Sequence, residues 1–208
     1  MAHGRAIAMI GGHVALDFAN TAGWHASEHR IEHLPGYGDL VAWARRTGVL
    51  SARVAAGLRR AAQRHPRQAE RARRRAIALR ERIYRVFAAI AQGRAPSAED
   101  LVGLHAARAA AIRRAAPRWS GTGVELHWPE DPSDLDLPLH PIALAAASLL
   151  GSIPAGRLRQ CGNHPCGWLF IDRSRSGARR WCSAQECGNI SRVRRFRARR
   201  SAAGRRGS

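Results

Sequence analysis

All the cysteines of the chain fall in one short segment, as two close pairs: Cys161 with Cys166, then Cys182 with Cys187. Their spacing, C-x4-C-x15-C-x4-C, is typical of a tetrahedral site in which four thiolates hold one Zn²⁺ ion. The sequence therefore predicts one structural zinc ion with these four ligands. Because four thiolates complete the coordination sphere and leave no place for water, we expect the metal to have no catalytic role.

The alternatives to zinc depend on the cellular compartment. No stretch of the sequence approaches the roughly 20 apolar residues that a membrane span needs, and the first residues do not resemble a signal peptide. We therefore expect a cytoplasmic protein with no membrane partner, in which clustered thiols stay reduced and favour metal. Two disulfides or four unrelated thiols are the alternatives, and His164, inside the first pair, is an alternative ligand.

The charge of the chain indicates a polyanionic partner. It has 35 basic residues, all of them arginine, against 15 acidic residues, which gives a formal net charge of +20. The excess is densest near the end, where residues 151–208 hold 14 arginines against two acids, a net of +12 (14 − 2). Such an excess favours nucleic acid over an anionic membrane surface as the partner.

The residues between the two cysteine pairs predict a small hairpin. WLFID and ARRWC can form its two arms, and Ser174–Gly177 can supply the turn. Asp172 would then pair with Arg179 or Arg180 on the opposite arm. The small core of the hairpin would consist of Trp168, Phe170 and Trp181. Glycine follows three of the cysteines, which suits knuckles that turn sharply or need a positive φ.

The arginine-rich segment after the last cysteine, NISRVRRFRARR, predicts a helix that is capped by Asn189. The apolar side of this helix, which we expect to pack on the zinc module, consists of Ile190, Val193 and Phe196. Guanidinium groups bind phosphate in a bidentate manner and can read guanine in the major groove. The candidate nucleic-acid contacts are therefore Arg179, Arg180, Arg192, Arg194, Arg195 and Arg197. The alternative is a solvated run of charge without a partner, above all beyond Ser201.

The first part of the chain predicts mostly helices. A long helix should run from about Pro66 to Gln92, because apolar residues recur there at steps of three and four while the other face is rich in arginine. The last helix should open at His140-Pro141. The expected N-caps of two further helices are Asp39 and Ser51, and the segment Ser97–Asp100 reads as the start of another helix. The segment Met9–Thr21 reads as a short buried strand, and Val124–Trp128 reads as a strand or hairpin.

These elements predict a mainly α fold with a small β component (α+β), in two parts. A helical domain over residues 1–152 should precede a treble-clef-like or hairpin–helix zinc module over residues 153–208. The segment Gly151–Gly156 is the expected boundary, because its glycines and proline interrupt the preceding apolar helix.

Polar and aromatic residues just after the first predicted strand are candidates for a ligand pocket. They are Asp17, Asn20, Trp24 and His25. The alternative is that Asp17 and Asn20 are turn or cap residues and that Trp24 belongs to the core. The sequence contains no Ser-His-Asp order, phosphate-loop glycine pattern or HExxH motif, so we expect that the protein is not an enzyme.

The run C-x4-CGWLF-x-D-x-SR-x3-RRWCS-x3-CGN-x3-VRRFR closely resembles the CGNR zinc-finger domain of bacterial transcription regulators. The front of the chain, through GGHVALDFANT and DLVAW…GVL, resembles the ABATE domain that precedes this finger in the family. The resemblance implies a stress-induced transcription regulator with a sensory front domain. The arginine that completes the name of the motif is here Ile190, so a contact made by that residue is lost or moves to Arg192.

We therefore expect a DNA-binding transcription regulator whose front domain senses a small-molecule effector. Two rival functions share the same features. One is an RNA- or ribosome-associated zinc protein, and the other is a protein-interaction module whose zinc hairpin docks on transcription machinery. The sequence leaves open the operator, the effector, activation or repression, and the formation of a homodimer.

Overall fold

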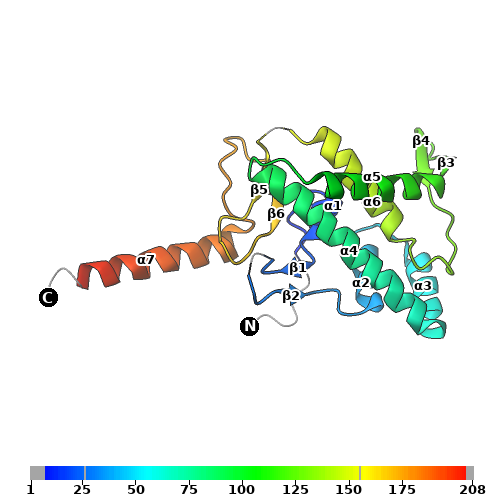
Figure 1. The fold of residues 1–208 in the computed structure, drawn as a ribbon, viewed down its shortest axis with the longest axis horizontal. Coiled ribbons are helices and arrows are strands. Elements are labelled where there is room, and N and C mark those ends of the chain that lie inside the picture. The colour runs from blue at the N-terminus through cyan, green and yellow to red at the C-terminus, as the bar shows by residue number, and fades with distance from the viewer. Residues whose placement is uncertain (1–7, 26, 155, 205–208) are drawn as a thin grey trace.

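The computed structural model describes residues 8–25, 27–154 and 156–204, and within them a body of helices is joined to a small cysteine-rich module (Figure 1). The helices are α1 (Val14–Ala19), α2 (Tyr37–Arg46), α3 (Ala52–Arg64), α4 (Pro66–Ala91), α5 (Ala98–Arg113), α6 (Leu139–Ser152) and α7 (Asn189–Gly204). Three antiparallel pairs are formed by β1 (Ala22–Gly23) with β2 (Ile31–Glu32), β3 (Ala116–Trp119) with β4 (Val124–His127), and β5 (Leu158–Gln160) with β6 (Leu169–Ile171). The fold is mainly α with a small β component, as the sequence predicts.

Helix α4 is the centre of the body and packs against α1, α2, α3, α5 and α6. One side of it is buried at steps of three and four residues, at Ala72, Ala76, Leu79, Ile83 and Phe87. Most of the arginines of this helix point to the other side, which gives the sequence its helical period. The predicted long helix is confirmed to within one residue at its end.

The starts of the helices show how the sequence sets their positions. Ser51 is confirmed as an N-cap, and the helix start predicted at Ser97–Asp100 is confirmed with Ser97 as its N-cap. Each hydroxyl accepts a hydrogen bond from the backbone N–H three residues further on. Asp39 is not the N-cap of α2, which begins at Tyr37. Its carboxylate instead accepts a hydrogen bond from the N–H of Gly36 at 2.9 Å, and so still satisfies a free donor at the helix start.

The predicted strand over Met9–Thr21 is wrong, because this segment forms helix α1. The helix starts at His13, whose Nδ1 accepts a hydrogen bond from the N–H of Ala15 at 3.3 Å. A short continuous apolar run fits a buried strand and a buried helix equally well. Here the run packs against α4 and α6, so both sides of a short helix are covered.

Strands β3 and β4 form a hairpin that stands out from the body at the end opposite to α7 (Figure 1). The predicted strand over Val124–Trp128 is confirmed as β4. Helix α6 begins at Leu139, one residue before the predicted start. Among the described residues, every helix is too short or too polar to cross a membrane.

Candidate metal centre and cationic helix

The four cysteine thiols converge on one point. They come from four different local structures: the residue after β5 (Cys161), a tight turn (Cys166), a bend (Cys182) and the π-helical turn Ala184–Gly188 (Cys187). All four side chains are buried, and their sulfur atoms lie within 4.8 Å of one another. His164, the alternative ligand, is exposed and lies outside this cluster.

The distances between the sulfurs fit a tetrahedral metal site. Cys166 Sγ lies 3.6 Å from Cys182 Sγ, which lies 3.5 Å from Cys187 Sγ. Zn–S bonds of about 2.3 Å in a tetrahedron place the sulfurs about 3.8 Å apart, whereas a disulfide bond is about 2.05 Å long. Contacts with the other three sulfurs, followed by burial, raise the pKa of the Cys182 thiol. Four thiolates this close together would repel one another, and a divalent cation offsets their repulsion. The cluster therefore fits one structural zinc ion held by four thiolates.

Hydrogen-bond donors surround the sulfurs. The N–H of Cys182 donates to Cys161 Sγ, and Asn163 Nδ2 donates to Cys187 Sγ, both at 3.5 Å. Such donors stabilise thiolates and orient them toward a metal. Gly167, directly after the second ligand, has a φ of 69°, a conformation that other residues rarely adopt. The tight first knuckle therefore depends on a glycine at this position.

A small apolar core lies behind the metal site. Phe170 is fully buried, and Trp168 and Trp181 pack around the same cluster, as the sequence predicts. Arg179 closes the core, because its guanidinium lies 4.2 Å from the centroid of the Phe170 ring and donates to the carbonyls of Trp181 and Cys182. Arg179 was predicted to contact nucleic acid, and the structure uses it to brace the module.

The pairing predicted for the zinc hairpin is wrong. Strand β6 pairs with β5, which precedes the first cysteine, and not with the ARRWC segment. The predicted turn is present, since the N–H of Gly177 donates to the carbonyl of Ser174. Beyond this turn the chain returns to the first knuckle, where the carbonyl of Arg180 accepts a hydrogen bond from the N–H of Gly162 at 2.9 Å.

Asp172 is buried and organises this turn. Its carboxylate accepts hydrogen bonds from the N–H of Arg179 at 2.9 Å and from the N–H and hydroxyl of Ser174. The Ser174 hydroxyl is the main cause that holds the pKa of Asp172 below its usual range. The predicted pairing of Asp172 with Arg179 is present, and it is made through the backbone N–H of Arg179.

Direct hydrogen bonds join the module to the helical body. Asn20, fully buried after α1, donates from Nδ2 to the carbonyl of Leu169 at 2.8 Å and accepts from its N–H at 2.9 Å. The Trp168 indole donates to a carbonyl of β1 at 2.9 Å, and the N–H of His25 donates to the carbonyl of Cys166 at 3.0 Å. The first knuckle and β6 are thus built into the surface of the body.

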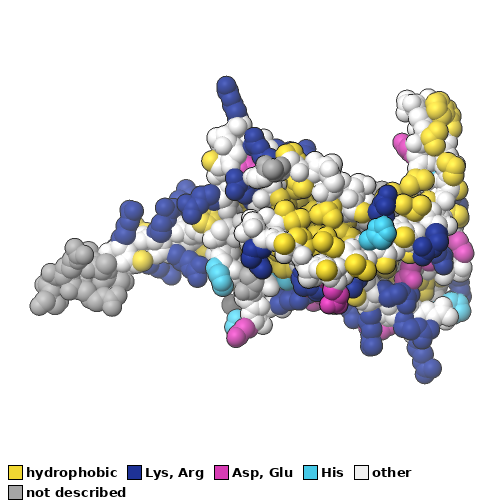
Figure 2. Space-filling view, turned by 45° about the horizontal axis from the view of Figure 1, so that its top comes forward, with side chains coloured by type: hydrophobic (Ala, Val, Ile, Leu, Met, Phe, Trp, Pro, Cys, Tyr) yellow, Lys and Arg dark blue, Asp and Glu magenta, His cyan; other side chains and the backbone are white. Residues whose placement is uncertain are grey.

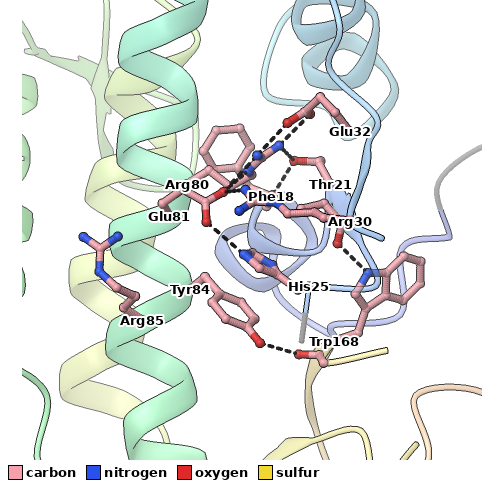
Figure 3. Close-up of polar contacts among 12 residues, drawn as sticks. Phe18, Thr21, His25, Arg30, Glu32, Arg80, Glu81, Tyr84, Arg85 and Trp168 are labelled. Atoms are coloured by element: carbon pink, nitrogen blue, oxygen red, sulfur yellow. Dashed lines mark hydrogen bonds and ion pairs between the residues drawn. The ribbon is translucent and has the colours of Figure 1, made fainter. Parts of the chain in front are cut away.

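A network of charged side chains centred on the buried Arg80 lies behind this junction (Figure 3). Arg80 on α4 is fully buried, and its guanidinium makes two hydrogen bonds of 2.7 Å to Glu32 and one of 2.9 Å to Glu81. Glu81 also contacts His25 Nε2 at 2.9 Å and pairs with Arg30. Burial opposes the ionisation of Glu81, but the hydrogen bond from His25 and the surrounding charges outweigh it and lower the pKa of Glu81 to about 2.

The four residues predicted to line a ligand pocket have other contacts. The carboxylate of Asp17 accepts a backbone hydrogen bond at 2.8 Å from the preceding loop, and burial raises its pKa. Asn20 and His25 belong to the junction, and the His25 ring stacks on Tyr84 with centroids 3.5 Å apart (Figure 3). Trp24 is 43% exposed with a φ of 53°, so it is not a core residue either.

A cavity of about 560 Å³ lies elsewhere, between the end of α6 and the turn after β6. Its lining includes His13, Ile153, Arg157, Ile171, Arg173 and Arg175. The sequence gives no sign of this cavity, because its residues come from three segments that are distant in the chain. Arg157 belongs to this lining, but nothing in the sequence distinguishes it from the many other arginines.

Helix α7 leaves the module and extends into solvent (Figures 1 and 2). The predicted packing of Ile190, Val193 and Phe196 on the module is wrong, because these side chains are 41%, 40% and 60% exposed. Asn189 is not an N-cap, since the helix continues directly from the π-helical turn. That turn is capped by Ser183, whose hydroxyl accepts a backbone hydrogen bond at 3.2 Å.

The remaining arginines predicted to contact nucleic acid are at the surface. Figure 2 shows arginine side chains along α7. Arg194 Nη1 reaches Asn163 Oδ1 at 3.3 Å, and the guanidinium of Arg180 lies 5.4 Å from the centroid of the Trp181 ring. The exposed members of the predicted set are Arg180, Arg192, Arg194, Arg195 and Arg197.

The fold and the site define a two-part zinc protein: a helical body, fused to a closed four-cysteine metal site that carries a cationic helix. Family models match both parts. Residues 12–153 match ABATE, described as "Putative stress-induced transcription regulator", and residues 157–200 match the CGNR zinc finger. The chain belongs to the ABATE family and carries a CGNR zinc finger with a structural zinc site. A comparison with curated proteins found no match.

Proposed function

We propose that this protein is a transcription regulator that binds DNA through α7, and that it performs no catalytic step. The observation that carries the proposal is the position of α7. Residues 189–200 hold six arginines and no acidic residue, and the helix extends from the zinc module into solvent (Figure 1). A fixed base and an exposed cationic helix are the two parts that a phosphate-binding element needs.

The dimensions and chemistry of α7 suit duplex DNA. An α-helix fits the major groove, which is about 12 Å wide, and guanidinium groups bind both phosphates and guanine edges. We place Arg192, Arg194, Arg195 and Arg197 in the contact set, with Arg180 beside them. We leave Arg179 out, because its guanidinium is used by backbone carbonyls of the module.

The departure from the family motif falls on the same surface. Ile190 is 41% exposed at the start of α7, so a longer arginine at this position would reach a partner rather than brace the module. The loss of that arginine therefore removes one partner contact and leaves the metal site intact. Arg192, two residues further along the helix, is the residue that we expect to take over the contact.

Regulation by a small molecule is part of the same proposal. The cavity between the end of α6 and the turn after β6 touches both the body and the zinc module. Three arginines among its lining residues favour an anionic effector. An effector bound there would contact both parts, and the junction hydrogen bonds of Asn20 would transmit its effect. A thermal-shift screen of small organic anions tests this part, with Arg173→Gln expected to reduce any stabilisation.

One observation favours a second function. Ile190, Val193 and Phe196 form an exposed apolar row on a helix that is otherwise cationic. Such a row suits a protein partner with an apolar groove and acidic rim, so that α7 would dock on the transcription machinery. An RNA partner has the same electrostatic basis as DNA, and we treat it as an outcome of the test.

The test uses the full chain loaded with zinc, because the module is built into the body. The protein is incubated with a random DNA library and excess competitor at two salt concentrations. We expect enrichment of a short motif, loss of that enrichment in Arg192→Gln and Arg195→Gln, and retention in Arg60→Gln on the exposed face of α3. If about six phosphates are neutralised, the slope of log K against log salt is about −5.

Three results would contradict the proposal. The first is an absence of DNA binding, and the second is equal binding by the α7 variants and the Arg60 control. The third is tighter binding to structured RNA than to any enriched DNA, which supports the RNA-associated alternative. A steep salt dependence without an enriched motif would indicate that α7 binds DNA non-specifically. The sequence specificity would then have to come from a partner protein.

A further inference from the structure

The β3–β4 hairpin carries an uncovered apolar face. Its register pairs Trp119 with Val124 and Pro117 with Leu126, so these four side chains share one face of the hairpin. Trp119 is 68% exposed, Val124 is 69% exposed and Leu126 is 44% exposed. Figure 2 shows this hairpin as an apolar column that rises from the body.

A hairpin of two strands is too small to bury this apolar face as a core of its own. Such hairpins are at best marginally stable alone and need a third strand or a covering layer. The base of the hairpin is attached, because the Trp128 indole donates to the carbonyl of Ala111 at 2.8 Å. The strands above that point have nothing over their apolar face among the described residues, which is typical of a contact surface.

The two edges of the hairpin differ in their ability to accept another strand. The turn is closed by a hydrogen bond from the N–H of Ser120 to the carbonyl of Gly123 at 2.8 Å. With the register above, this pattern turns the N–H groups of Val124 and Leu126 outward on β4. On β3, Pro117 occupies one of the outward positions and has no N–H to offer. The open edge is therefore β4.

The charge of the hairpin separates it from the rest of the molecule. Residues 116–127 contain one arginine and one glutamate, a formal net charge of zero (1 − 1), in a chain of net charge +20. A polyanion would not select such a segment. Two copies of a strongly cationic protein repel each other, so they need an uncharged contact in order to associate.

We propose that β4 pairs in an antiparallel manner with β4 of a second copy of this chain, with the two-fold axis at Leu126. The resulting four-stranded sheet joins the two apolar faces into one. In this register Glu125 lies opposite the partner's His127 and also beside Arg118 of its own hairpin. An axis at Glu125 would place the two carboxylates opposite each other, which is unfavourable. An axis at Val124 would place Leu126 against the polar turn.

The proposal is independent of the proposed function and has a consequence for it. The hairpin and α7 lie at opposite ends of the molecule (Figure 1). Pairing through β4 therefore leaves both cationic helices free. The dimer presents two such helices that are far apart, and a polyanion can engage both without competing for the contact between the copies.

Sedimentation equilibrium of the zinc-loaded full chain tests the pairing. The subunit mass is 22.7 kDa, and we expect a concentration-dependent species of twice that mass. Leu126→Lys places two ammonium groups at the axis and should leave a monomer. Val102→Lys on α5, at a position that is 68% exposed, adds the same charge away from the hairpin and should leave the dimer unchanged. A monomeric wild type, or a Leu126→Lys dimer as tight as the wild type, overturns the proposal.

A crosslink tests the register. At the axis the Cα atoms of the two copies of residue 126 lie about 5.5 Å apart, within the range that a disulfide needs. Leu126→Cys should therefore form a crosslinked dimer under mild oxidation while the zinc ligands stay protected. In Val124→Cys the two new thiols lie on strands offset by about 14 Å, so that variant should stay uncrosslinked. Crosslinking at position 124, or at neither position, overturns the register.

Discussion

The cysteine module and α7 are neighbours in the sequence, but they are held in different ways. Phe170 in the module is fully buried, whereas Phe196 on α7 is 60% exposed. The module is fixed from within by four sulfurs and from outside by Asn20, while α7 packs mainly against the π-helical turn before it. The difference indicates that the metal site supplies a rigid base and that the helix remains free to meet a partner.

The largest effect should follow from removal of a zinc ligand. We expect Cys182→Ser to lose the metal and unfold the module, because a structural zinc ion contributes on the order of 10 kcal/mol to folding. Metal content by mass spectrometry and thermal unfolding by circular dichroism measure this. His164→Ala is the matched control and should keep its zinc. Zinc retained at full occupancy in Cys182→Ser, or lost in His164→Ala, contradicts the assigned ligand set.

The two phenylalanines test the comparison directly. Phe170→Ala removes a fully buried ring and should lower the free energy of unfolding by about 3–5 kcal/mol. Phe196→Ala removes an exposed ring and should change it by less than about 0.5 kcal/mol. Denaturant unfolding of both variants gives the numbers. Similar losses in the two variants would show that α7 is packed after all.

Two asparagines sharpen the comparison at the junction. Asn20→Ala leaves the N–H and carbonyl of Leu169 buried without their partner, which should cost about 2–4 kcal/mol of stability. Asn189→Ala, at the exposed start of α7, should stay within about 0.5 kcal/mol of the wild type. The same unfolding measurement compares them. A small effect at Asn20 would mean that the module is not anchored on the body.

The charge network around Arg80 predicts a dependence of stability on pH. The pKa of Glu81 is about 2, below the ordinary value of 4.5, so its stabilisation is present above about pH 4.5 and is lost as the pH falls toward 2. Glu81→Gln should lower the free energy of unfolding at pH 7 by about 2 kcal/mol and flatten its pH dependence in that window.

Glu70 is the control for this prediction. The Arg73 and Arg74 side chains also lower its pKa to about 2, but it lies on the surface, where solvent screens the pairs. Glu70→Gln should therefore change the pH profile of unfolding very little. Equal flattening in the two variants would assign the acid sensitivity to surface charge in general.

Local patterns predicted much of this molecule. The spacing of the four cysteines was sufficient for the metal site, because each pair forms a knuckle from residues close in the chain. The length of α4 followed from its apolar period. Ser51 was recognised as a cap and Ser97–Asp100 as a helix start, because the start of a helix is also set by local interactions. Each of these features is set by residues close together in the sequence, so it can be predicted without knowing which distant segment packs against it.

Apart from the caps predicted at Asp39 and Asn189, the errors concern contacts between distant segments. β6 pairs with β5, which is too short to show a strand pattern of its own, and Asn20 meets Leu169 149 positions later in the chain. The row that ends at Phe196 has the period of a packed helix, but a period shows which side is apolar and not what covers it. The same limit made the run that became α1 read as a strand.

Hydrogen exchange of the full chain, with zinc and after chelation, tests most directly whether the zinc module is built into the helical body. With zinc, we expect slow exchange in residues 158–171 and fast exchange in α7 beyond Val193. After chelation, protection should fall in residues 158–171 and also in the body segments that contact them, around Asn20 and Tyr84. Unchanged protection at Asn20 and Tyr84 after loss of the metal would contradict a zinc module built into the body.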